Sequence, residues 1–234
     1  MKNIIKYILV FLFLSNSIFA YYQVGDVISI EDQLHPLNVC YGEYPTDTLR
    51  LADFSSEFNS TSNKVIFFRM TASWWGPSCA DVPYFDDLHS LFEDQPIVIF
   101  ENVDDLYQPY SCEQWGNFGQ QGIPILTFDG NSGPPHYFFN MFGGLSYTWS
   151  VILGPDMVVK YSNQGSISAS VIQNILDEYQ ASGDINNDDI INIQDVILTI
   201  NLILDGEYIL FVDLNYDNII DILDLVLLID IILN

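Results

Sequence analysis

Short apolar stretches bounded by turn residues recur through the middle of the chain and alternate with longer amphipathic stretches. The length of the short stretches, and their content of β-branched and aromatic residues, is typical of strands. We expect five strands, at residues 65–70, 96–103, 123–128, 149–153 and 157–161. A further hairpin is expected from residues 27–31 and 37–40.

The amphipathic stretches predict the helices. Segments 81–93 and 166–179 carry apolar residues at helical spacing, and shorter helices are expected near 113–119 and 137–142. Because strands and helices alternate along the chain, the pattern predicts an α/β fold in which helices cover both faces of one sheet.

The first twenty residues, MKNIIKYILVFLFLSNSIFA, have the pattern of a signal peptide. Lys2 and Lys6 precede an apolar run, and Ala20 is a small residue at a suitable cleavage point. The run is too short to span a bilayer comfortably, and no later stretch of about twenty apolar residues follows it. We therefore expect residues 1–20 to be removed, no transmembrane segment in the mature chain, and export to the periplasm, the cell surface or the medium.

Charge divides the rest of the chain into two parts. Residues 21–182 carry 20 acidic and 4 basic side chains, whereas residues 183–234 carry 11 acidic side chains and no basic one. With 4 basic and 31 acidic residues the mature chain has a net charge of −27. Such a field repels phosphate backbones, so nucleic acid is excluded as a partner and cations are favoured. The change in composition predicts a domain boundary near Gln180 to Gly183.

Residues 68–83, FRMTASWWGPSCADVP, resemble the active-site turn of thioredoxin-like proteins, especially the redoxin branch of exported thiol-disulfide oxidoreductases. The segments VGDVISIEDQ, LRLADF, IPILTFD and SVILGPDMVVKY occur in the order found in that family, so the resemblance covers residues 24–179. It implies a thioredoxin-like domain at residues 21–182.

In that family the turn reads W-C-G-P-C. The first cysteine is activated at a helix N-terminus, and the second resolves the mixed disulfide. In this chain Trp75 stands at the first cysteine position and Ser78 at the second, although the flanking tryptophan, glycine and prolines keep their places. Thr148 stands where the family has a cis proline that faces the turn. The resemblance therefore implies an active site without its dithiol.

Three cysteines, Cys40, Cys79 and Cys112, meet an oxidising compartment after export. One disulfide and one free thiol is the simplest arrangement, and three pairings are open. One interpretation bridges Cys40 to Cys112 and leaves Cys79 as a small buried side chain on the first turn of a helix. The alternative makes Cys79 a catalytic residue that acts with Cys112, or places a cysteine or selenocysteine at a misread position 75. The three histidines, His35, His89 and His136, show no ligand or catalytic spacing.

The acidic C-terminal part contains an internal repeat with an offset of 29 residues. Both copies match a twelve-residue calcium loop, which supplies oxygen ligands from positions 1, 3, 5, 7, 9 and 12. In the first loop these positions are Asp184, Asn186, Asp188, Ile190, Asn192 and Asp195; in the second they are Asp213, Asn215, Asp217, Ile219, Asp221 and Asp224. Position 8 is apolar in both loops, as expected for a residue that packs between them. We therefore expect two Ca²⁺ sites.

Each loop is followed by one apolar helix, and position 12 is aspartate, so residues 183–234 resemble a type I dockerin module. The usual glycine at position 6 is replaced by Asp189 and Asn218, residue types that tolerate a left-handed backbone. Where dockerins carry small hydroxyl residues for cohesin recognition, this chain has Ile193-Gln194 and Ile222-Leu223. The resemblance implies a small all-α module and a protein partner, which is a cohesin or another surface protein.

Two hypotheses for the function follow, and the dockerin resemblance implies a third, in which the module docks the protein to a surface complex alongside polysaccharide-degrading partners. In the first, an exported thioredoxin-fold protein without a dithiol binds or attaches through a calcium-dependent module. In the second, the protein is a thiol-disulfide oxidoreductase that works through Cys79. A dithiol is the stronger catalyst because a single cysteine has no resolving partner.

Overall fold

A computed structural model describes most of the chain beyond the N-terminal segment. The described residues are 21–55, 58, 64–120, 122, 125–128, 137–142, 148–179, 182–186, 188, 190–209, 212–215, 217 and 219–233. The expected signal peptide at 1–20 lies outside them, as do His136, Asp189 and Asn218.

One mixed sheet forms the centre of the larger part, with the strand order β2-β1-β5-β4-β3-β6-β7. Strand β3 pairs in parallel with β4, which pairs in parallel with β5, and the other pairings are antiparallel. The strands are β1 (Leu37–Tyr41), β2 (Thr48–Leu49), β3 (Val65–Ala72), β4 (Ile97–Asp104), β5 (Ile125–Phe128), β6 (Trp149–Leu153) and β7 (Val159–Gln164). All five predicted strands are therefore confirmed, although β7 begins two residues later than expected.

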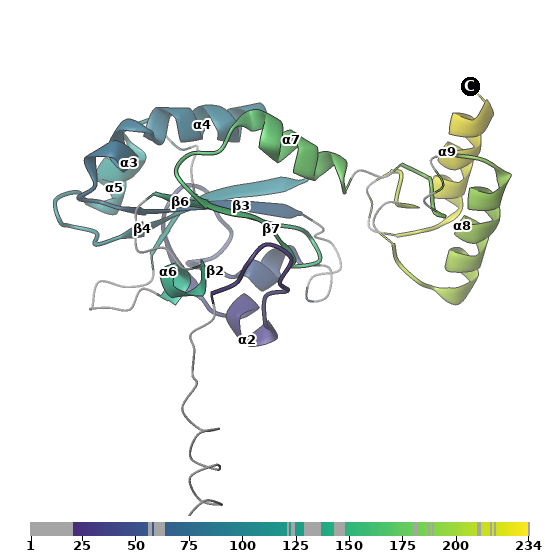
Figure 1. The fold of residues 1–234 in the computed structure, drawn as a ribbon, viewed down its shortest axis with the longest axis horizontal. Coiled ribbons are helices and arrows are strands. Elements are labelled where there is room, and N and C mark those ends of the chain that lie inside the picture. Colours follow the sequence, from purple (N-terminus) through teal and green to yellow (C-terminus); the bar gives the residue numbers. More distant parts are fainter. Residues whose placement is uncertain are drawn as a thin grey trace, which may run out of the picture.

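Helices cover both faces of the sheet, as predicted. Figure 1 shows α4 and α7 side by side over one face, with α2 and α6 on the other. The helices of this part are α2 (Ile30–Gln33), the 3-10 turn η1 (Leu51–Phe54), α3 (Gly76–Ala80), α4 (Val82–Leu91), α5 (Cys112–Gly116), α6 (Tyr137–Phe142) and α7 (Ala169–Asp177).

Alternation along β3 separates two hydrophobic cores. Side chains of a strand point to opposite faces in turn, so Phe67 packs towards α4 and α7 with Phe85 and Ile172. Phe68 packs on the opposite face against Phe138. Because both faces are covered, all eight residues of β3 are buried, which explains why its sequence reads as a nearly continuous apolar run.

The predicted hairpin of residues 27–31 and 37–40 is wrong. Strand β1 pairs with β2 and β5, and residues 30–33 form helix α2. Ser29 caps this helix, because its hydroxyl accepts a hydrogen bond from the backbone N–H of Asp32 at 3.2 Å. The Asp32 carboxylate in turn accepts from the Ser29 hydroxyl at 2.8 Å, and also from the hydroxyls of Tyr22 and Tyr137. This local capping pattern outweighs the β-branched residues of the segment.

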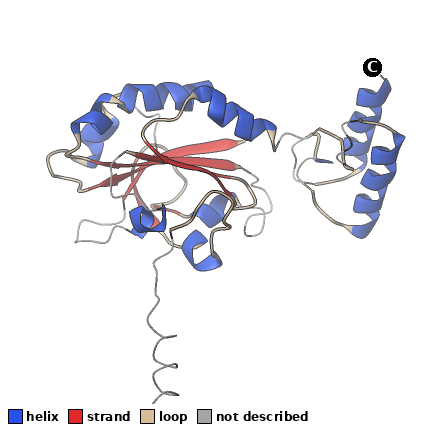
Figure 2. Ribbon diagram, in the orientation of Figure 1, coloured by secondary structure: helices blue, strands red, loops and turns tan. Residues whose placement is uncertain are grey.

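Residues 182–233 contain helices and loops, with no strand among those that are described (Figure 2). Helices α8 (Ile193–Asp205) and α9 (Ile222–Leu233) follow the two acidic repeats and pack on a small core of Val196, Leu225 and Leu228. Ile191 packs against this core, and Ile220, the equivalent residue of the second repeat, is also buried. Gly183 has a φ of +76°, and a Cβ there would lie 2.6 Å from Leu228, so the first loop begins in close contact with α9.

Candidate functional site

The turn that resembles a redox site lies at the carboxyl end of β3. Residue Trp75 has an extended backbone at the N-cap of α3, and the backbone N–H of Cys79 donates back to its carbonyl at 3.3 Å. The strand-to-helix geometry that would present a nucleophile is therefore present. The residue presented at that point is an indole, which has no thiol with which to attack a disulfide.

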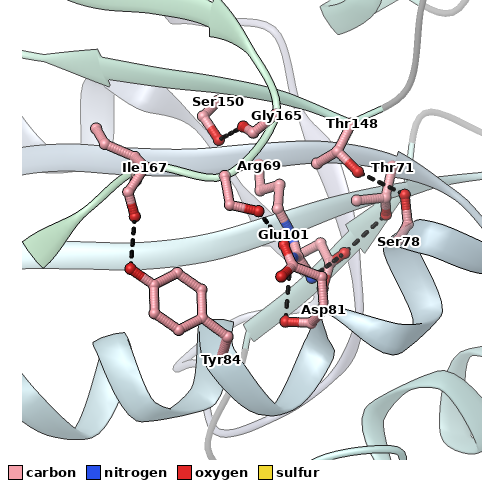
Figure 3. A network of polar contacts seen from close by, with 11 residues as sticks. Arg69, Thr71, Ser78, Asp81, Tyr84, Glu101, Thr148, Ser150, Gly165 and Ile167 are labelled. Carbon is pink, nitrogen blue, oxygen red and sulfur yellow. Dashed lines mark hydrogen bonds and ion pairs between the residues drawn. The ribbon is translucent and has the colours of Figure 1, made fainter.

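A pair of hydroxyl groups occupies the position expected for the second cysteine. Ser78 is fully buried, and its Oγ lies 2.6 Å from Oγ1 of Thr148 (Figure 3). Thr148 is also buried and directly precedes β6. The residue expected to face the turn thus does face it, and it joins Ser78 in a hydrogen bond. Two hydroxyls in this place have no redox chemistry.

The two tryptophans of the turn are partly exposed. Trp74 is 49% and Trp75 38% exposed, and their rings meet edge to face with centroids 5.8 Å apart. The indole N–H of Trp74 donates to the Asp105 carboxylate at 2.8 Å, which fixes the ring to the loop after β4. Tyr107 on the same loop is 68% exposed. We call Trp74, Trp75 and Tyr107 the aromatic rim.

Cys79 is half-buried and forms no disulfide. Burial raises the pKa of its thiol, and the negative charge of Glu101 raises it further. Cys40 and Cys112 form a disulfide with their Cα atoms 6.1 Å apart, which is the pairing of the first interpretation among the three that the sequence leaves open. All three cysteines contact the same small core around Trp115. Cys79 is therefore a free thiol with a raised pKa that packs against the same core as the Cys40–Cys112 disulfide.

Sequence reasoning missed a buried ion network beneath the turn. Arg69 and Glu101 are paired in register on β3 and β4, and the Arg69 guanidinium lies 3.0 Å from carboxylate oxygens of both Glu101 and Asp81. The Thr71 hydroxyl donates to Glu101 at 2.7 Å (Figure 3). The Arg69 guanidinium carbon lies over the Phe85 ring, 4.5 Å from its centroid. The sequence does carry a signal for this network: Arg69 lies inside the apolar run VIFFRM, and a charged residue in a buried strand needs a buried partner.

Asp86 is a second buried acid near this network. Its side chain is fully buried, and one carboxylate oxygen accepts a hydrogen bond from the backbone N–H of Gln120. The other oxygen has no hydrogen-bond partner among the described residues. Burial raises the pKa of Asp86 to about 6, a shift that the Gln120 hydrogen bond opposes and the charge of Glu101 reinforces. Asp86 therefore retains its proton under mildly acidic conditions.

The two described histidines lie away from the turn. His89 is half-buried in α4, and burial lowers its pKa. His35 stacks on the ring of Tyr137 with centroids 3.6 Å apart.

The two acidic loops have matching hydrogen bonds. In the first loop, one carboxylate oxygen of Asp195 accepts from the backbone N–H of Ile185 at 2.8 Å and the other from that of Asn192 at 2.8 Å. In the second, Asp224 accepts in the same way from Leu214 at 2.8 Å and Asp221 at 2.9 Å. The position-12 aspartates are both fully buried and close their loops.

The two acidic loops offer a uniform set of oxygen donors to a cation. Carboxylates, side-chain amides and one backbone carbonyl per loop offer oxygen only, which is the chemistry that a hard divalent cation prefers. Within the part of the chain that the structure describes, no three acidic, histidine or cysteine side chains gather around one point in a manner that would hold a metal ion. The donor chemistry of the loops suits a hard cation such as Ca²⁺, but the described side chains are not gathered into a metal site.

The fold is a mixed α/β, thioredoxin-like one. Strands β3 and β4 are joined by a helical crossover, and the antiparallel pair β6 and β7 is followed by helix α7. The turn at Trp75 joins the carboxyl end of β3 to the first residue of α3. No described helix is long and apolar enough to cross a membrane.

Comparison with known proteins gives likenesses of fold. No family model and no curated protein matches the chain. Among solved structures, the chain is similar to the exposed lipoprotein thioredoxin Etrx1 of Streptococcus pneumoniae strain TIGR4, with 17% identity over 61% of this chain and 98% of that one and a TM-score of 0.45. It is also similar to a putative thiol:disulfide interchange protein DsbE of Chlorobium tepidum, with 15% identity over 66% of this chain and 99% of that one and a TM-score of 0.48.

Proposed function

We propose that this chain is an exported binding or attachment protein, in which a thioredoxin-like domain without a dithiol, residues 21–182, is joined to a calcium-dependent dockerin-like module, residues 183–234. The observation that carries the first half is the buried Ser78–Thr148 hydroxyl pair beside Trp75. Disulfide exchange needs a thiolate that attacks and a second thiol that releases the product. Neither position of the turn supplies one.

Cys79 does not replace the missing cysteines as the nucleophile of disulfide exchange. The reactive form of cysteine is the thiolate, and both burial and Glu101 raise the pKa of this thiol. The aromatic rim then acts as a contact surface for a partner protein. Exposed indole and phenol rings are common in such surfaces because each has a large apolar face and a polar group.

The test is disulfide reduction on an insulin substrate by the mature protein. We expect no turnover above that of the Cys79→Ser variant. A Trp75→Cys/Ser78→Cys double variant serves as the positive control, because it restores two thiols to a turn of the right geometry. Turnover by the wild type that disappears in Cys79→Ser would overturn the proposal.

The alternative function is a thiol-disulfide oxidoreductase that uses Cys79. It is favoured by the packing of Cys79 against the same core as the Cys40–Cys112 disulfide. In that case the Cys79 thiolate attacks the sulfur of Cys112, a Cys79–Cys112 disulfide forms, and Cys40 leaves as a thiolate. Mass spectrometry of peptides from the mature protein under a mild thiol buffer would detect the exchanged disulfide, which the binding proposal does not predict.

The second half of the proposal is calcium binding by the two loops. The ligands would be the oxygens of residues 1, 3, 5, 7, 9 and 12 of each loop, with the backbone carbonyls of Ile190 and Ile219 at position 7. The bound cation would neutralise carboxylates that otherwise repel each other. Isothermal titration with Ca²⁺ should give two sites in the mature chain. It should give one site in the Asp195→Ala variant, since that aspartate closes the first loop.

Exposed apolar residues on the two C-terminal helices support a protein partner. They recur at the same repeat positions and at helical spacing: Ile193, Ile197, Ile200 and Leu204 on α8, and Ile222, Val226, Ile229 and Leu233 on α9. Each is between 39% and 78% exposed. Apolar surfaces of this extent on a small module mark interaction sites.

Binding to a purified cohesin module, with and without Ca²⁺, tests whether the partner is of that class. An Ile197→Asp/Val226→Asp variant should lose the interaction, since it places a charge on each apolar stripe. A Glu207→Gln variant, which changes a residue outside both stripes, serves as the control. An absence of cohesin binding would direct the search to other surface proteins.

A further inference from the structure

A cavity at the opposite end of the sheet from the redox-like turn is separate from the function proposed above. It has a volume of about 550 Å³, which is within the usual range for small-molecule sites. Its wall includes Val98 and Ile125, which lie at the amino ends of the parallel strands β4 and β5, and Lys64, which directly precedes β3. Trp75 follows the carboxyl end of β3, so the cavity and the Trp75 turn lie at opposite ends of the parallel strands.

The cavity is lined by two of the few cations in this acidic chain. Residues 21–234 contain four basic side chains, Arg50, Lys64, Arg69 and Lys160. Arg69 is buried in ion pairs with Asp81 and Glu101, and Lys160 pairs with Glu178 at 2.8 Å. Both of the remaining cations line this cavity. Within the described part of the chain, neither of them lies within 4 Å of a carboxylate oxygen as an ion pair.

Three other polar side chains of the lining, those of Tyr44, Thr46 and Asp53, are engaged in hydrogen bonds. The Tyr44 hydroxyl donates to the Asp53 carboxylate at 2.9 Å, and the same carboxylate accepts from the backbone N–H of Arg50 at 2.8 Å. The Thr46 hydroxyl donates to the Thr48 carbonyl at 2.6 Å. The lining therefore combines two exposed cations, Arg50 and Lys64, with one engaged carboxylate, that of Asp53. Its local charge is positive, which favours a ligand that brings acceptor atoms and negative charge.

The remaining wall is apolar and aromatic. Phe54 and Val98 are buried, Ile125 is half-buried, and the Tyr44 ring lies 6.3 Å from that of Phe54. Such a surface favours a ligand with a carbon body beside its charge. Arg50 and Lys64 outnumber the one lining carboxylate, that of Asp53, so the cavity has a local positive charge although the whole chain has a net charge of −25.

From this geometry we propose that the cavity binds a small organic carboxylate, whose charged group is held by Arg50 and Lys64 and whose carbon body lies on Phe54, Val98 and Ile125. The planar guanidinium suits the two oxygens of a carboxylate, and the ammonium supplies a second charge. An aromatic acid and an acidic sugar share this chemistry, and they differ in the body that meets the apolar wall.

The test is isothermal titration of the mature protein with phenylacetate and with galacturonate. Phenylacetamide and galactose serve as uncharged controls. At least one of the two acids should bind, and the uncharged controls should not. Arg50→Gln and Lys64→Gln should each weaken the binding about tenfold or more, as expected for loss of a charge-assisted hydrogen bond. Binding of phenylacetate alone would identify an aromatic or alkyl acid, and binding of galacturonate alone an acidic sugar.

A matched variant separates the site from general electrostatics. Lys160→Gln removes one positive charge on β7, outside the cavity lining, and should leave the affinity within about twofold. Binding of neither acid, equal binding of the uncharged controls, or an equal loss in Lys160→Gln would each overturn the proposal. Thermal melts of the three variants verify that they remain folded. The insulin assay is independent of this cavity, so failure of either proposal leaves the other intact.

Discussion

At the scale of single residues, the buried hydrogen bond between Ser78 and Thr148 contributes to the stability of the turn. A buried hydroxyl that loses its partner costs about 1–3 kcal/mol, while removal of both partners leaves no unsatisfied group. We expect Ser78→Ala and Thr148→Val each to lower the free energy of unfolding by about 1–2 kcal/mol. The Ser78→Ala/Thr148→Val variant should lose less than the sum of the two. A double-mutant cycle by urea unfolding measures this, and strictly additive losses would show that the two hydroxyls do not interact.

Asp86 makes the stability of the domain depend on pH. Its pKa is raised to about 6 in the folded protein, chiefly by burial, and returns to an ordinary aspartate value of about 3.9 on unfolding. The folded state therefore holds the proton more tightly. The stability that this group contributes is fully present below pH 4 and is lost as the pH rises through 6.

Asp86→Asn removes that loss, because the amide stays uncharged at every pH. The variant should be more stable than the wild type at pH 7.5 by about 1–3 kcal/mol, and the difference should disappear near pH 4. Urea unfolding at the two pH values measures the effect, with the exposed neighbour Asp87 changed to asparagine as the control. A gain of equal size at both pH values would contradict this account.

At the scale of elements, the parallel pairing of β3 with β4 brings Arg69 and Glu101 together inside the protein. Breaking a buried ion pair from one side leaves an uncompensated charge, which costs about 3–5 kcal/mol. We expect Glu101→Leu alone to destabilise the domain by that amount. Arg69→Met/Glu101→Leu should destabilise it much less, although Asp81 then loses its ion pair and keeps only the hydrogen bond from Ser166. Chemical unfolding of both variants tests this, and a double variant no better than the single one would contradict it.

Most helices and strands could be predicted from the sequence, and the wrong predictions are confined to short segments. The predicted limits of β6 match the structure to the residue, and those of β4 lie within one residue, because these segments have strong periodicity between clear turn residues. Helix α2 was missed because the cap formed by Ser29 and Asp32 acts over four residues, less than a periodicity window spans. Local hydrogen bonds decided that segment.

Only those parts of the site that follow from a local motif or from the order of the strands could be predicted from the sequence. The places of Trp75, Ser78 and Thr148 follow from the motif and the order of the strands, and the structure brings Ser78 and Thr148 together. The contacts of Arg69 with Glu101 depend on which strands are neighbours and in what register. The register of β3 with β4 places Arg69 opposite Glu101, and no local sequence pattern determines that register.

At the scale of the whole molecule, the two parts are stabilised by different means. The thioredoxin-like part has two large cores and a disulfide, whereas α8 and α9 share a small core of three buried residues with Ile191, Ile203 and Leu214 packed against it. Each acidic loop carries four carboxylates, and these repel each other without a cation. Because binding of a metal stabilises only the folded loop, the free energy of calcium binding would contribute directly to folding of this part.

We therefore expect a chelator such as EGTA to melt residues 183–234 and to spare the rest. All four tryptophans lie at or before position 149, so their fluorescence reports the thioredoxin-like part alone, while circular dichroism also reports α8 and α9. Chelation should reduce the helical signal and leave tryptophan emission unchanged, and added Ca²⁺ should restore the helical signal. An unchanged circular dichroism spectrum would show that the loops fold without a cation. A simultaneous change in tryptophan emission would show that the two parts unfold as one unit.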